Sequence, residues 1–587
     1  MTFIYPFTFV LAFCALFYEL LIARAVSLWA VNNAIWYALA VGIFIGGMGL
    51  GAWLTGLAGN KEPAWRRLLK VESGLALAGG VSVLAVYCAA LGGLFLSLTG
   101  NDLLGRGLFF GVAFLASLGV GIGAGMELPL LMLMAEEVPA GKPASTPGEK
   151  VARILLADYA GSLAAGLVFP LVILPAMSIM SAAVLVALIN AVAALWLLWH
   201  SRARSGRKRV WLLVFLLTAL YCISPRIEGY FTAKYYFSFQ DALTPVEFFK
   251  PRIYPGRVER LRSPYQVIDL VTADDIGPEA RALGAAYIKP EPGQNKDLEG
   301  AVLFLNNDFQ FAVSFERIYH EAFAHIPVAA QERAPQKVLI LGAGDGLLLR
   351  EVLKYPSVKE VVLVDIDPLV LAIFRNVRAL ADLNHNSLID PRVRVVKGDA
   401  YQYVRRSREQ FDMVFCDFPN PDDFDLAKLY SREFYSFVRA RLASGGLLII
   451  DAPGLANERS RDERKVWDIL SNSLSAAGYR SLTPFFSRLE DSDPAALAAV
   501  GSEVEVLRGY LFALTAGFIM ASAEERDLTT FQPLKTNDLR VMTNERLRLG
   551  LAEAGQYDLI ADLANVNSIV HPVFPLRRDA GRIRTGY

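Results

Sequence analysis

Long apolar runs in the first 225 residues constrain this chain more than any other feature of its sequence. A helix needs about 20 apolar residues to cross roughly 30 Å of hydrocarbon. The runs that reach or approach this length are residues 3–27, 36–57, 75–98, 108–134, 154–174, 177–199 and 210–223. The first lacks the basic region and cleavage site of a signal peptide, so it is expected to be retained. We therefore predict a multi-span α-helical membrane bundle of about seven transmembrane helices.

The last run is the weakest of the seven. As a helix of about 14 residues it would be only about 21 Å long, so we expect it to be tilted, re-entrant or interfacial. Cationic residues gather between the second and third runs and between the sixth and seventh, which places those loops and the N-terminus in the cytoplasm. Seven full crossings would then put the rest of the chain outside. The later part of the chain carries a nucleotide-binding pattern, described below, and a nucleotide-like substrate is expected in the cytoplasm. We therefore expect the seventh run not to cross fully, in a multi-pass protein of the cell inner membrane whose catalytic domain would be cytoplasmic.

Acidic residues inside the apolar runs are the polar candidates of this half: Glu19, Glu127 and Asp158. A carboxylate at membrane depth is costly unless it is paired or lines a polar cavity. These three residues are therefore expected either to form a cation or amine site or to belong to an internal Glu–Arg pair. The many glycines of the second and fourth runs are expected to let helices approach closely.

After Ser224 the sequence has the charge distribution of a soluble protein, although the 587 residues carry no net charge overall, which gives no indication of nucleic-acid binding. We predict a transmembrane domain over 1–225, a small β-domain over 226–330, a Rossmann-like domain over 331–530 and an α-rich tail over 531–587. The expected fold is thus a membrane bundle followed by a small β-domain and an α/β, class I methyltransferase-like domain.

A nucleotide-binding pattern begins at residue 337. The apolar strand 337–341 runs into Gly342-Ala343-Gly344-Asp345-Gly346, and a second strand, 360–364, ends in Asp365-Ile366-Asp367. Glycines in such a turn let the backbone approach a ligand, and the acid after the second strand accepts from ribose hydroxyls.

Two further strands, 394–396 and 411–415, are followed by Asp399 and Asp417. The carboxyl ends of parallel strands meet at one edge of a sheet, so Asp345, Asp365, Asp399 and Asp417 are expected to lie along one rim. The glycine turn lacks the Lys-Ser/Thr of a triphosphate-binding loop, and no His/Cys cluster indicates a metal. An adenosyl-type ligand is therefore expected.

These motifs resemble the polyamine aminopropyltransferase family, in particular its membrane-bound bacterial members. The glycine turn is similar to the family's GGGDG loop, and Asp417-Phe418-Pro419-Asn420-Pro421 to its Asp-x-x-Asp-Pro motif. Ser263-Pro264-Tyr265-Gln266, the segment 303–310 (expected as one strand ending in Gln310) and Tyr319-His320-Glu321 also resemble family motifs, as do the segments around Glu19, Glu127 and Asp158.

The resemblance implies transfer of an aminopropyl group from decarboxylated S-adenosylmethionine, a co-substrate, to an amine, with release of methylthioadenosine and without a cofactor. It implies that Asp417 accepts the proton of the attacking amine. The implied donor-binding residues are Gln266, Gln310, Gly342, Gly344, Asp345, Gly346, Asp365 and Asp399, and the implied acceptor-binding residues are Tyr265, Tyr319 and Asn420.

The departures from the family pattern concern the acceptor. Asn420 replaces the second catalytic Asp, Asn306-Asn307 replaces an Asp-Gly, and Phe315 replaces an acid, which weakens the attraction for a dication. The lost acids leave open the same chemistry on a lipid-borne amine. The nucleotide pattern also suits an S-adenosylmethionine methyltransferase, and Glu19, Glu127 and Asp158 leave open a polyamine transporter or sensor. The expected partners are a small amine acceptor and the lipid bilayer, not nucleic acid, with a homodimer as an open alternative.

Overall fold

In the computed structural model the chain forms two compact units, and the division between them falls after residue 251. The structure describes residues 3–29, 33–57, 62–137, 147–201, 206–237, 244–250, 256–273, 301–313, 315–331, 333–419, 421, 424–452, 455, 463–488, 515–534, 536, 538–552 and 554–573. The boundary lies later than the predicted end of the membrane domain at residue 225. The reason is that the last long helix of the first unit continues well beyond that residue.

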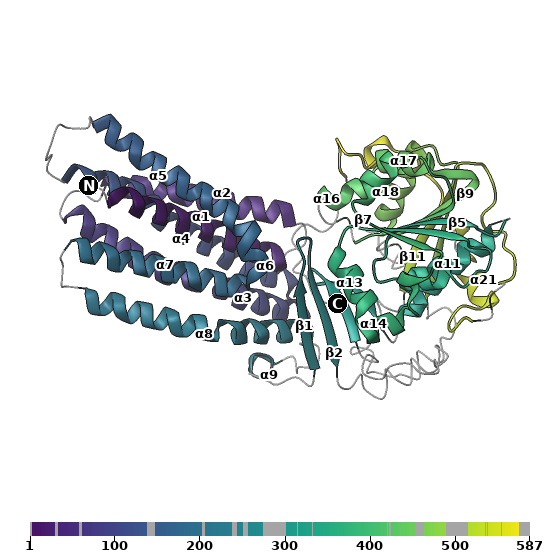
Figure 1. The fold of residues 1–587 in the computed structure, drawn as a ribbon, viewed down its shortest axis with the longest axis horizontal. Helices are drawn as coiled ribbons and strands as arrows, with labels where there is room; N and C mark the ends of the chain where they lie inside the picture. Colours follow the sequence, from purple (N-terminus) through teal and green to yellow (C-terminus); the bar gives the residue numbers. More distant parts are fainter. Residues whose placement is uncertain are drawn as a thin grey trace. The chain divides into compact units, whose positions relative to one another are not determined.

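The first unit is built from long apolar helices (Figure 1). Within the described residues, seven helical segments are long and apolar enough to cross a membrane. They are α1 (Ile4–Trp29), α2 (Asn33–Leu57), α3 (Ala64–Leu98), α4 (Asp102–Glu137), α5 (Pro147–Val168) with its continuation through α6 (Leu174–Ala176), α7 (Ile179–His200) and α8 (Arg207–Phe237).

Helix α8 corrects the prediction of a short seventh span. It contains 31 residues, which corresponds to a length of about 46 Å, and it continues through Pro225. Apolar length was a poor guide here because the second half of the helix carries charged residues, among them Glu228 and Lys234, whose side chains are buried in the unit. The helix is therefore long enough to cross a bilayer.

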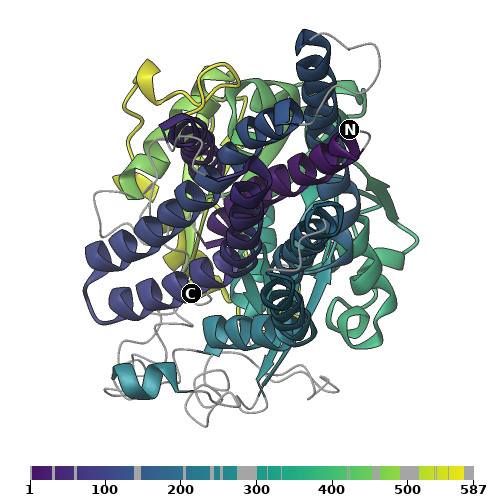
Figure 2. The same ribbon diagram turned by 90° about the vertical axis from the view of Figure 1, so that its left-hand side faces the viewer.

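Helix α3 lies at the centre of this unit. It packs against α1, α4, α7 and α8, while α2 packs on α1 and α4, and α5 packs mainly on α1. Figure 2, which views the bundle more nearly end-on, shows these helices side by side. The outer helices α2, α5 and α8 expose large apolar side chains, including Trp53, Leu163 and Phe215.

Glycines explain the close approach of α2 and α4. A Cβ atom at Gly47 or Gly51 would overlap the main chain of α4, and one at Gly121 or Gly125 would overlap the main chain of α2. On each helix the two glycines are four residues apart, so they lie on one face. The predicted role of the glycines in packing is thus supported at these four positions.

We expect Gly125→Ala to destabilise the bundle by about 1–3 kcal/mol, because the added methyl group would overlap the main chain of Met48 and force the helices apart. The measurement is the midpoint of thermal unfolding of the full chain in detergent. Gly49→Ala is the matched control, since a Cβ atom at Gly49 has no heavy atom within 4 Å. Equal midpoints for the two variants would contradict the packing argument.

The second unit contains a seven-stranded sheet in the order β10-β11-β9-β8-β5-β6-β7. The strands β9, β8, β5, β6 and β7 are parallel, and β11 and β10 join antiparallel at one edge. Their bounds are β5 (Lys337–Gly342), β6 (Glu360–Asp365), β7 (Val393–Lys397), β8 (Phe411–Asp417), β9 (Leu442–Asp451), β10 (Ser481–Arg488) and β11 (Thr515–Ser522). The predicted strands 337–341, 360–364, 394–396 and 411–415 are all present.

Helices cover both faces of this sheet, which is the expected Rossmann-type arrangement. On β5, Val338 and Ile340 belong to one apolar core and Leu339 and Leu341 to the other, which explains why the strand is apolar throughout. The first face carries α11 (Glu316–Ala330), α12 (Leu347–Val352), α13 (Pro368–Asn376), α14 (Arg378–Leu383) and α21 (Asn544–Ala552). The second carries α15 (Ala400–Arg406), α17 (Arg432–Arg439) and α18 (Glu463–Ala476).

A separate antiparallel sheet precedes these elements, in the order β1 (Gly256–Arg262), β2 (Val267–Ala273), β3 (Ala301–Leu305) and β4 (Asp308–Ala312). Here the prediction of a single strand over 303–310 was wrong. Asn306 and Asn307 have φ values of 52° and 66°, so they form a two-residue turn between β3 and β4. Asparagine tolerates this left-handed backbone, which hairpins of this length require.

The C-terminal segment is less helical than predicted. Among its described residues, α21 is the only α-helix, accompanied by single 3₁₀ turns at Ala554–Gln556 and Leu563–Asn565. The segment nevertheless packs on the unit, because Leu547 and Leu551 of α21 are part of the core of the first face.

Candidate active site at the edge of the parallel sheet

The turn after β5 brings the ends of two strands into contact. Gly342 has a φ of 85° and is paired in register with Asp417 of β8. A Cβ atom at Gly342 would overlap the carbonyl oxygen of Asp417, so glycine is required both for the backbone conformation and for the close approach. Ala343 also has a left-handed backbone, with a φ of 54°, at a position where glycine would be unstrained.

Strand order predicts a ligand site at this point. The chain runs outward from β5 through β6 to β7 and then returns to β8 on the other side of β5. Such a reversal opens a crevice at the carboxyl ends of the two central strands, where open α/β sheets bind ligands. Asp345 follows β5 and Asp417 ends β8, so both lie at this reversal.

Asp417 is paired with Tyr319 of α11. The Tyr319 hydroxyl donates to Asp417 Oδ1 at 2.8 Å. Burial and the nearby charge of Asp345 raise the pKa of Asp417 to about 6, against the opposing effects of His320 and of the Tyr319 hydrogen bond. A carboxyl group with such a pKa can accept a proton near neutral pH, as a general base must.

Asp345 and Asp365 lie on either side of the glycine turn. Asp345 Oδ1 accepts from the main-chain N–H of Leu347 at 2.8 Å, and Asp365 Oδ1 accepts from that of Asp367 at 2.7 Å. A Cβ atom at Gly344 would lie 2.6 Å from Asp365 Oδ2, so this glycine makes room for the carboxylate. Burial is the main reason that the pKa of Asp365 is raised to about 6.

Asp399 lies at the next strand end. Its Oδ1 accepts from the N–H of Tyr401 at 2.7 Å, which caps α15, and its Oδ2 lies 3.5 Å from Lys428 Nζ. The N–H of the preceding Gly398 donates to the carbonyl of Asp365 at 2.9 Å. The four aspartates predicted for one rim therefore occupy adjacent strand ends, and sequence reasoning missed the Lys428 contact.

Residues of the small sheet contact the same rim. Gln266 Nε2 and Ser263 Oγ both donate to Asp367 Oδ2, at 2.8 and 2.7 Å. Asp367 is fully buried, and its other oxygen accepts from the N–H of Leu369. Asp367 thus fastens Gln266 beside Asp365, a role that could be inferred from its place in the predicted motif.

Two other predicted residues of the small sheet differ in environment. Gln310 lies on β4, and its side-chain amide donates to the carbonyls of Asp308 and Phe309 at 3.3 and 3.2 Å. Tyr265 lies in the turn between β1 and β2 and its side chain is 54% exposed. Asn420, predicted for the acceptor, lies outside the described residues.

Asp451, at the end of β9, is a further acid of this rim that sequence reasoning missed. Its charge acts on both Tyr319 and Tyr430, and the Tyr430 hydroxyl donates to the carbonyls of Phe418 and Pro419, directly after Asp417. The rule that placed the other aspartates, an acid at the end of an apolar strand, would have identified it.

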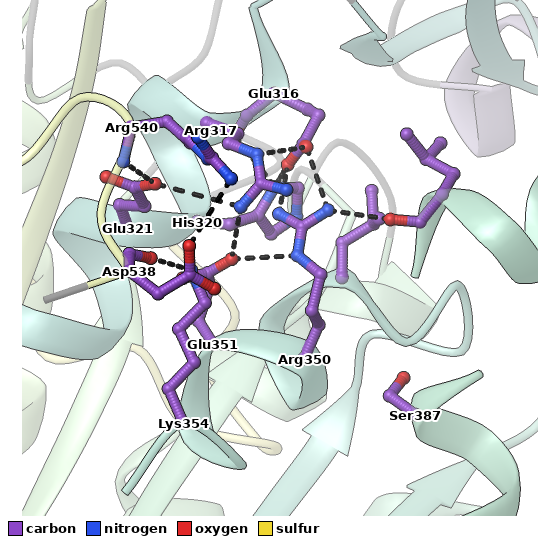
Figure 3. A network of polar contacts seen from close by, with 12 residues as sticks. Glu316, Arg317, His320, Glu321, Arg350, Glu351, Lys354, Ser387, Asp538 and Arg540 are labelled. Atoms are coloured by element: carbon purple, nitrogen blue, oxygen red, sulfur yellow. Dashed lines mark hydrogen bonds and ion pairs between the residues drawn. The ribbon is translucent and has the colours of Figure 1, made fainter. Parts of the chain in front are cut away.

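A buried ionic network joins α11 and α12 (Figure 3). Arg350 of α12 makes a two-pronged contact with Glu316 of α11, both distances being 2.9 Å, and its Nε donates to Glu351 at 2.8 Å. Against the effect of burial, the Arg350 guanidinium lowers the pKa of Glu316 to about 2. His320 connects this network to the site, since its Nδ1 lies 2.9 Å from Glu316 Oε2 and its charge acts on Asp345 and Asp417.

The neighbouring Glu321 holds the C-terminal segment. Its carboxylate accepts from the main-chain N–H groups of Arg540, Val541 and Met542, each at 2.8 Å. Charge-assisted bonds of this kind are stronger than those between neutral groups. The Tyr319-His320-Glu321 motif therefore has three separate functions: contact with Asp417, connection to the network and attachment of the C-terminal segment.

In the first unit, the three predicted polar residues have different environments. Glu127 of α4 is 5% exposed, whereas Glu19 of α1 and Asp158 of α5 are partly exposed. The charges of Glu127 and Asp158 act on each other. Sequence reasoning missed Glu72 of α3, which is fully buried. Glu72 lies before the predicted span 75–98. It is inside the bundle because α3 begins at Ala64 rather than near residue 75.

The fold of the second unit defines a Rossmann-type protein, and comparison with known proteins defines its family. The profile of the spermine/spermidine synthase domain matches residues 316–467. The chain is 32% identical over 477 residues to polyamine aminopropyltransferase 2 of Ralstonia nicotianae, covering 81% of this chain and 82% of that protein. It is also 32% identical to polyamine aminopropyltransferase 1 of Streptomyces coelicolor, over 80% of this chain and 78% of that protein.

A crystal structure of spermidine synthase in complex with the transition state analogue AdoDATO is 23% identical, with a TM-score of 0.38, and covers 50% of this chain and 85% of that one. The named relatives establish the family of the chain. It belongs to the polyamine aminopropyltransferase family and is an aminopropyltransferase enzyme.

Proposed function

We propose that this enzyme transfers the aminopropyl group of decarboxylated S-adenosylmethionine to a primary amine, with Asp417 as the general base. The observation that carries the proposal is the 2.8 Å contact between Tyr319 and Asp417 at the point where the strand order reverses. The glycine and aspartate motif would also suit a methyltransferase. The names of the relatives favour aminopropyl transfer over methyl transfer.

The proposed reaction is a nucleophilic substitution at carbon. The acceptor nitrogen forms a bond to the methylene carbon next to the sulfonium, the carbon–sulfur bond breaks, and its electron pair neutralises the sulfur in methylthioadenosine. The nitrogen loses one proton, which Asp417 accepts. Asp345 would attract the cationic aminopropyl arm, and Asp365 and Asp399 would hold the nucleoside hydroxyls and the adenine. Holding the two reacting atoms in line supplies much of the acceleration.

Two of the three departures at the acceptor side have structural roles. Asn306 forms the β3–β4 turn, and its Oδ1 accepts from the N–H of Val267 at 3.0 Å. Phe315 precedes α11 and its side chain is 2% exposed, so it is part of the core. These two replacements therefore need not mean a different acceptor, and we propose a small amine that is soluble in water.

The direct test is mass spectrometry of the products formed from decarboxylated S-adenosylmethionine and a panel of amines, with lipids present. We expect methylthioadenosine and an amine that has gained one aminopropyl group. Formation of S-adenosylhomocysteine from intact S-adenosylmethionine would instead support a methyltransferase. Turnover only with amino lipids would overturn the proposal of a soluble acceptor.

The pH dependence tests the role of Asp417. At saturating acceptor, kcat/KM for the donor should fall about tenfold per pH unit below about pH 6, because only the ionised carboxylate can accept a proton. The hydrogen bond from Tyr319 lowers the pKa of Asp417, so Tyr319→Phe should move this acid limb to higher pH. A limb that stays in place, or moves to lower pH, would contradict the assignment.

We further propose that the first unit crosses the cell inner membrane several times. Support comes from the seven long apolar helices and from the exposed apolar side chains on α2, α5 and α8, which suit contact with lipid. We place the transferase unit in the cytoplasm, where adenosyl substrates are found, although α8 is long enough to cross.

The side of the transferase unit can be measured with a membrane-impermeant maleimide. The reagent would be applied to a chain in which the native cysteines are replaced by serine and the exposed Asp425 by cysteine (Asp425→Cys). We expect labelling only after the cells are permeabilised. Labelling of intact cells would place this unit outside.

A further inference from the structure

Two carboxylates lie inside the helical bundle of the first unit, away from the sheet edge described above. Glu72 of α3 is fully buried, and Glu127 of α4 is 5% exposed. Their charges act on each other, and Tyr18 of α1 lies within the electrostatic range of both. Asn190 of α7 completes the cluster, with its Nδ2 donating to the carbonyl of Glu72 at 3.4 Å. Four helices therefore contribute one polar residue each.

Several acceptor atoms of this cluster lack hydrogen-bond partners. Both carboxylate oxygens of Glu72, Oδ1 of Asn190 and the hydroxyl of Tyr18 are buried and make no hydrogen bond. The side chains of Asn190 and Tyr18 are 0% and 1% exposed. Within the part of the chain that the structure describes, no Arg, Lys or His forms an ion pair with either glutamate. A buried charge normally has a partner, so the cluster is complete only with a further group.

The arrangement indicates what that group is. A proton on one glutamate would supply only one donor, whereas four buried acceptor atoms of Tyr18, Glu72 and Asn190 make no hydrogen bond. An ammonium group provides three N–H donors and a positive charge, so it can bond several separated acceptors at once and neutralise a carboxylate. Inorganic divalent cations need more oxygen ligands, and the described residues contain no group of three or more His, Cys, Asp or Glu suited to a metal.

The surroundings suit an alkyl chain. Along α3, Glu72 lies one helical turn from Leu68 and one from Ala76, which belong to two different apolar clusters of the bundle. The ring of Tyr18 lies against Gly79, where a Cβ atom would overlap it, so this glycine leaves the space that the tyrosine occupies. We propose that Glu72 and Glu127 bind the ammonium group of a primary alkylamine inside the helical bundle, with Tyr18 and Asn190 as further hydrogen-bonding partners.

The test is equilibrium binding of radiolabelled n-butylamine to the full chain in phosphatidylcholine nanodiscs. The double variant Glu72→Gln/Glu127→Gln should bind one equivalent fewer than the wild type, whether or not the transferase site also binds this amine. Tetramethylammonium, which has no N–H group, should not compete for that equivalent. The same stoichiometry in the wild type and the double variant, or full competition by tetramethylammonium, would overturn the proposal.

Two further variants distinguish loss of the binding site from misfolding. Glu149→Gln removes a carboxylate from the exposed start of α5 and should retain the wild-type stoichiometry. Tyr18→Phe keeps the charge of the cluster and removes one hydroxyl, so it should weaken binding about tenfold. Unchanged affinity in Tyr18→Phe would count against the geometry proposed here.

A lipid could supply the same ammonium group. Nanodiscs that contain phosphatidylethanolamine should compete with n-butylamine if the occupant is a lipid headgroup, whereas they should behave like phosphatidylcholine nanodiscs if it is a soluble amine. Both results retain the ammonium site, and they identify its source.

Discussion

Replacing Asp417 with asparagine should lower kcat by about 10²–10⁴-fold while leaving donor affinity nearly unchanged. The substitution keeps the size of the side chain and its contact with Tyr319 but removes the proton acceptor. The measurements are single-turnover kinetics for the chemical step and calorimetry for the donor. A variant that keeps most of its activity would refute the assignment of Asp417 as the base.

The same substitution should stabilise the folded protein at neutral pH. The pKa of Asp417 rises from 3.8 to about 6 on folding, so the folded state favours the protonated carboxyl, and ionisation above that range destabilises it. The gain from Asp417→Asn should therefore be absent below about pH 4, grow as the pH rises to 6 and stay constant above it. Asp382→Asn, at an exposed position on α14, is the matched control and should change the free energy of unfolding by at most about 0.5–1 kcal/mol. A gain that decreases with rising pH would contradict this reasoning.

Replacing Arg350 with methionine should destabilise the second unit by about 3–5 kcal/mol, the cost of removing one charged partner from a buried ionic network. Arg350 is 3% exposed and contacts Glu316 and Glu351, which are equally inaccessible to water. Removal of the guanidinium should also raise the pKa of Glu316 from about 2, because Arg350 is the largest effect that lowers it. The measurement is thermal unfolding of the full chain, together with proteolysis of the segment that follows residue 537.

The control for this variant is Arg378→Ala, which removes an exposed pair with Asp382 on the same unit and should change the free energy of unfolding by at most about 0.5–1 kcal/mol. A second variant, Arg350→Met/Glu316→Gln, should recover part of the loss, since it removes one of the two carboxylates that lose the Arg350 guanidinium. If Arg350→Met resembled Arg378→Ala, the network would not be a major source of stability.

The features that the sequence predicted correctly are those that depend on neighbouring residues alone. The seven apolar helices and the strands of the parallel sheet were predicted because apolar length and periodicity depend on neighbouring residues alone. The hairpin at Asn306 was missed because an Asn-Asn turn is a weaker signal than Asn-Gly. The length of α8 was underestimated because charged residues in its second half find buried positions in the bundle.

By itself, therefore, the sequence determined the membrane-type helices, the strand–glycine–acid pattern and the family resemblance. Only the tertiary structure decided which side chains meet. Tyr319 and Asp417 are 98 residues apart, and they touch because strand order places β8 beside β5 under α11. Glu72 and Glu127 come within electrostatic range of each other because α3 packs against α4. Such contacts depend on how whole elements pack, and packing is set by burial of surfaces from distant parts of the chain.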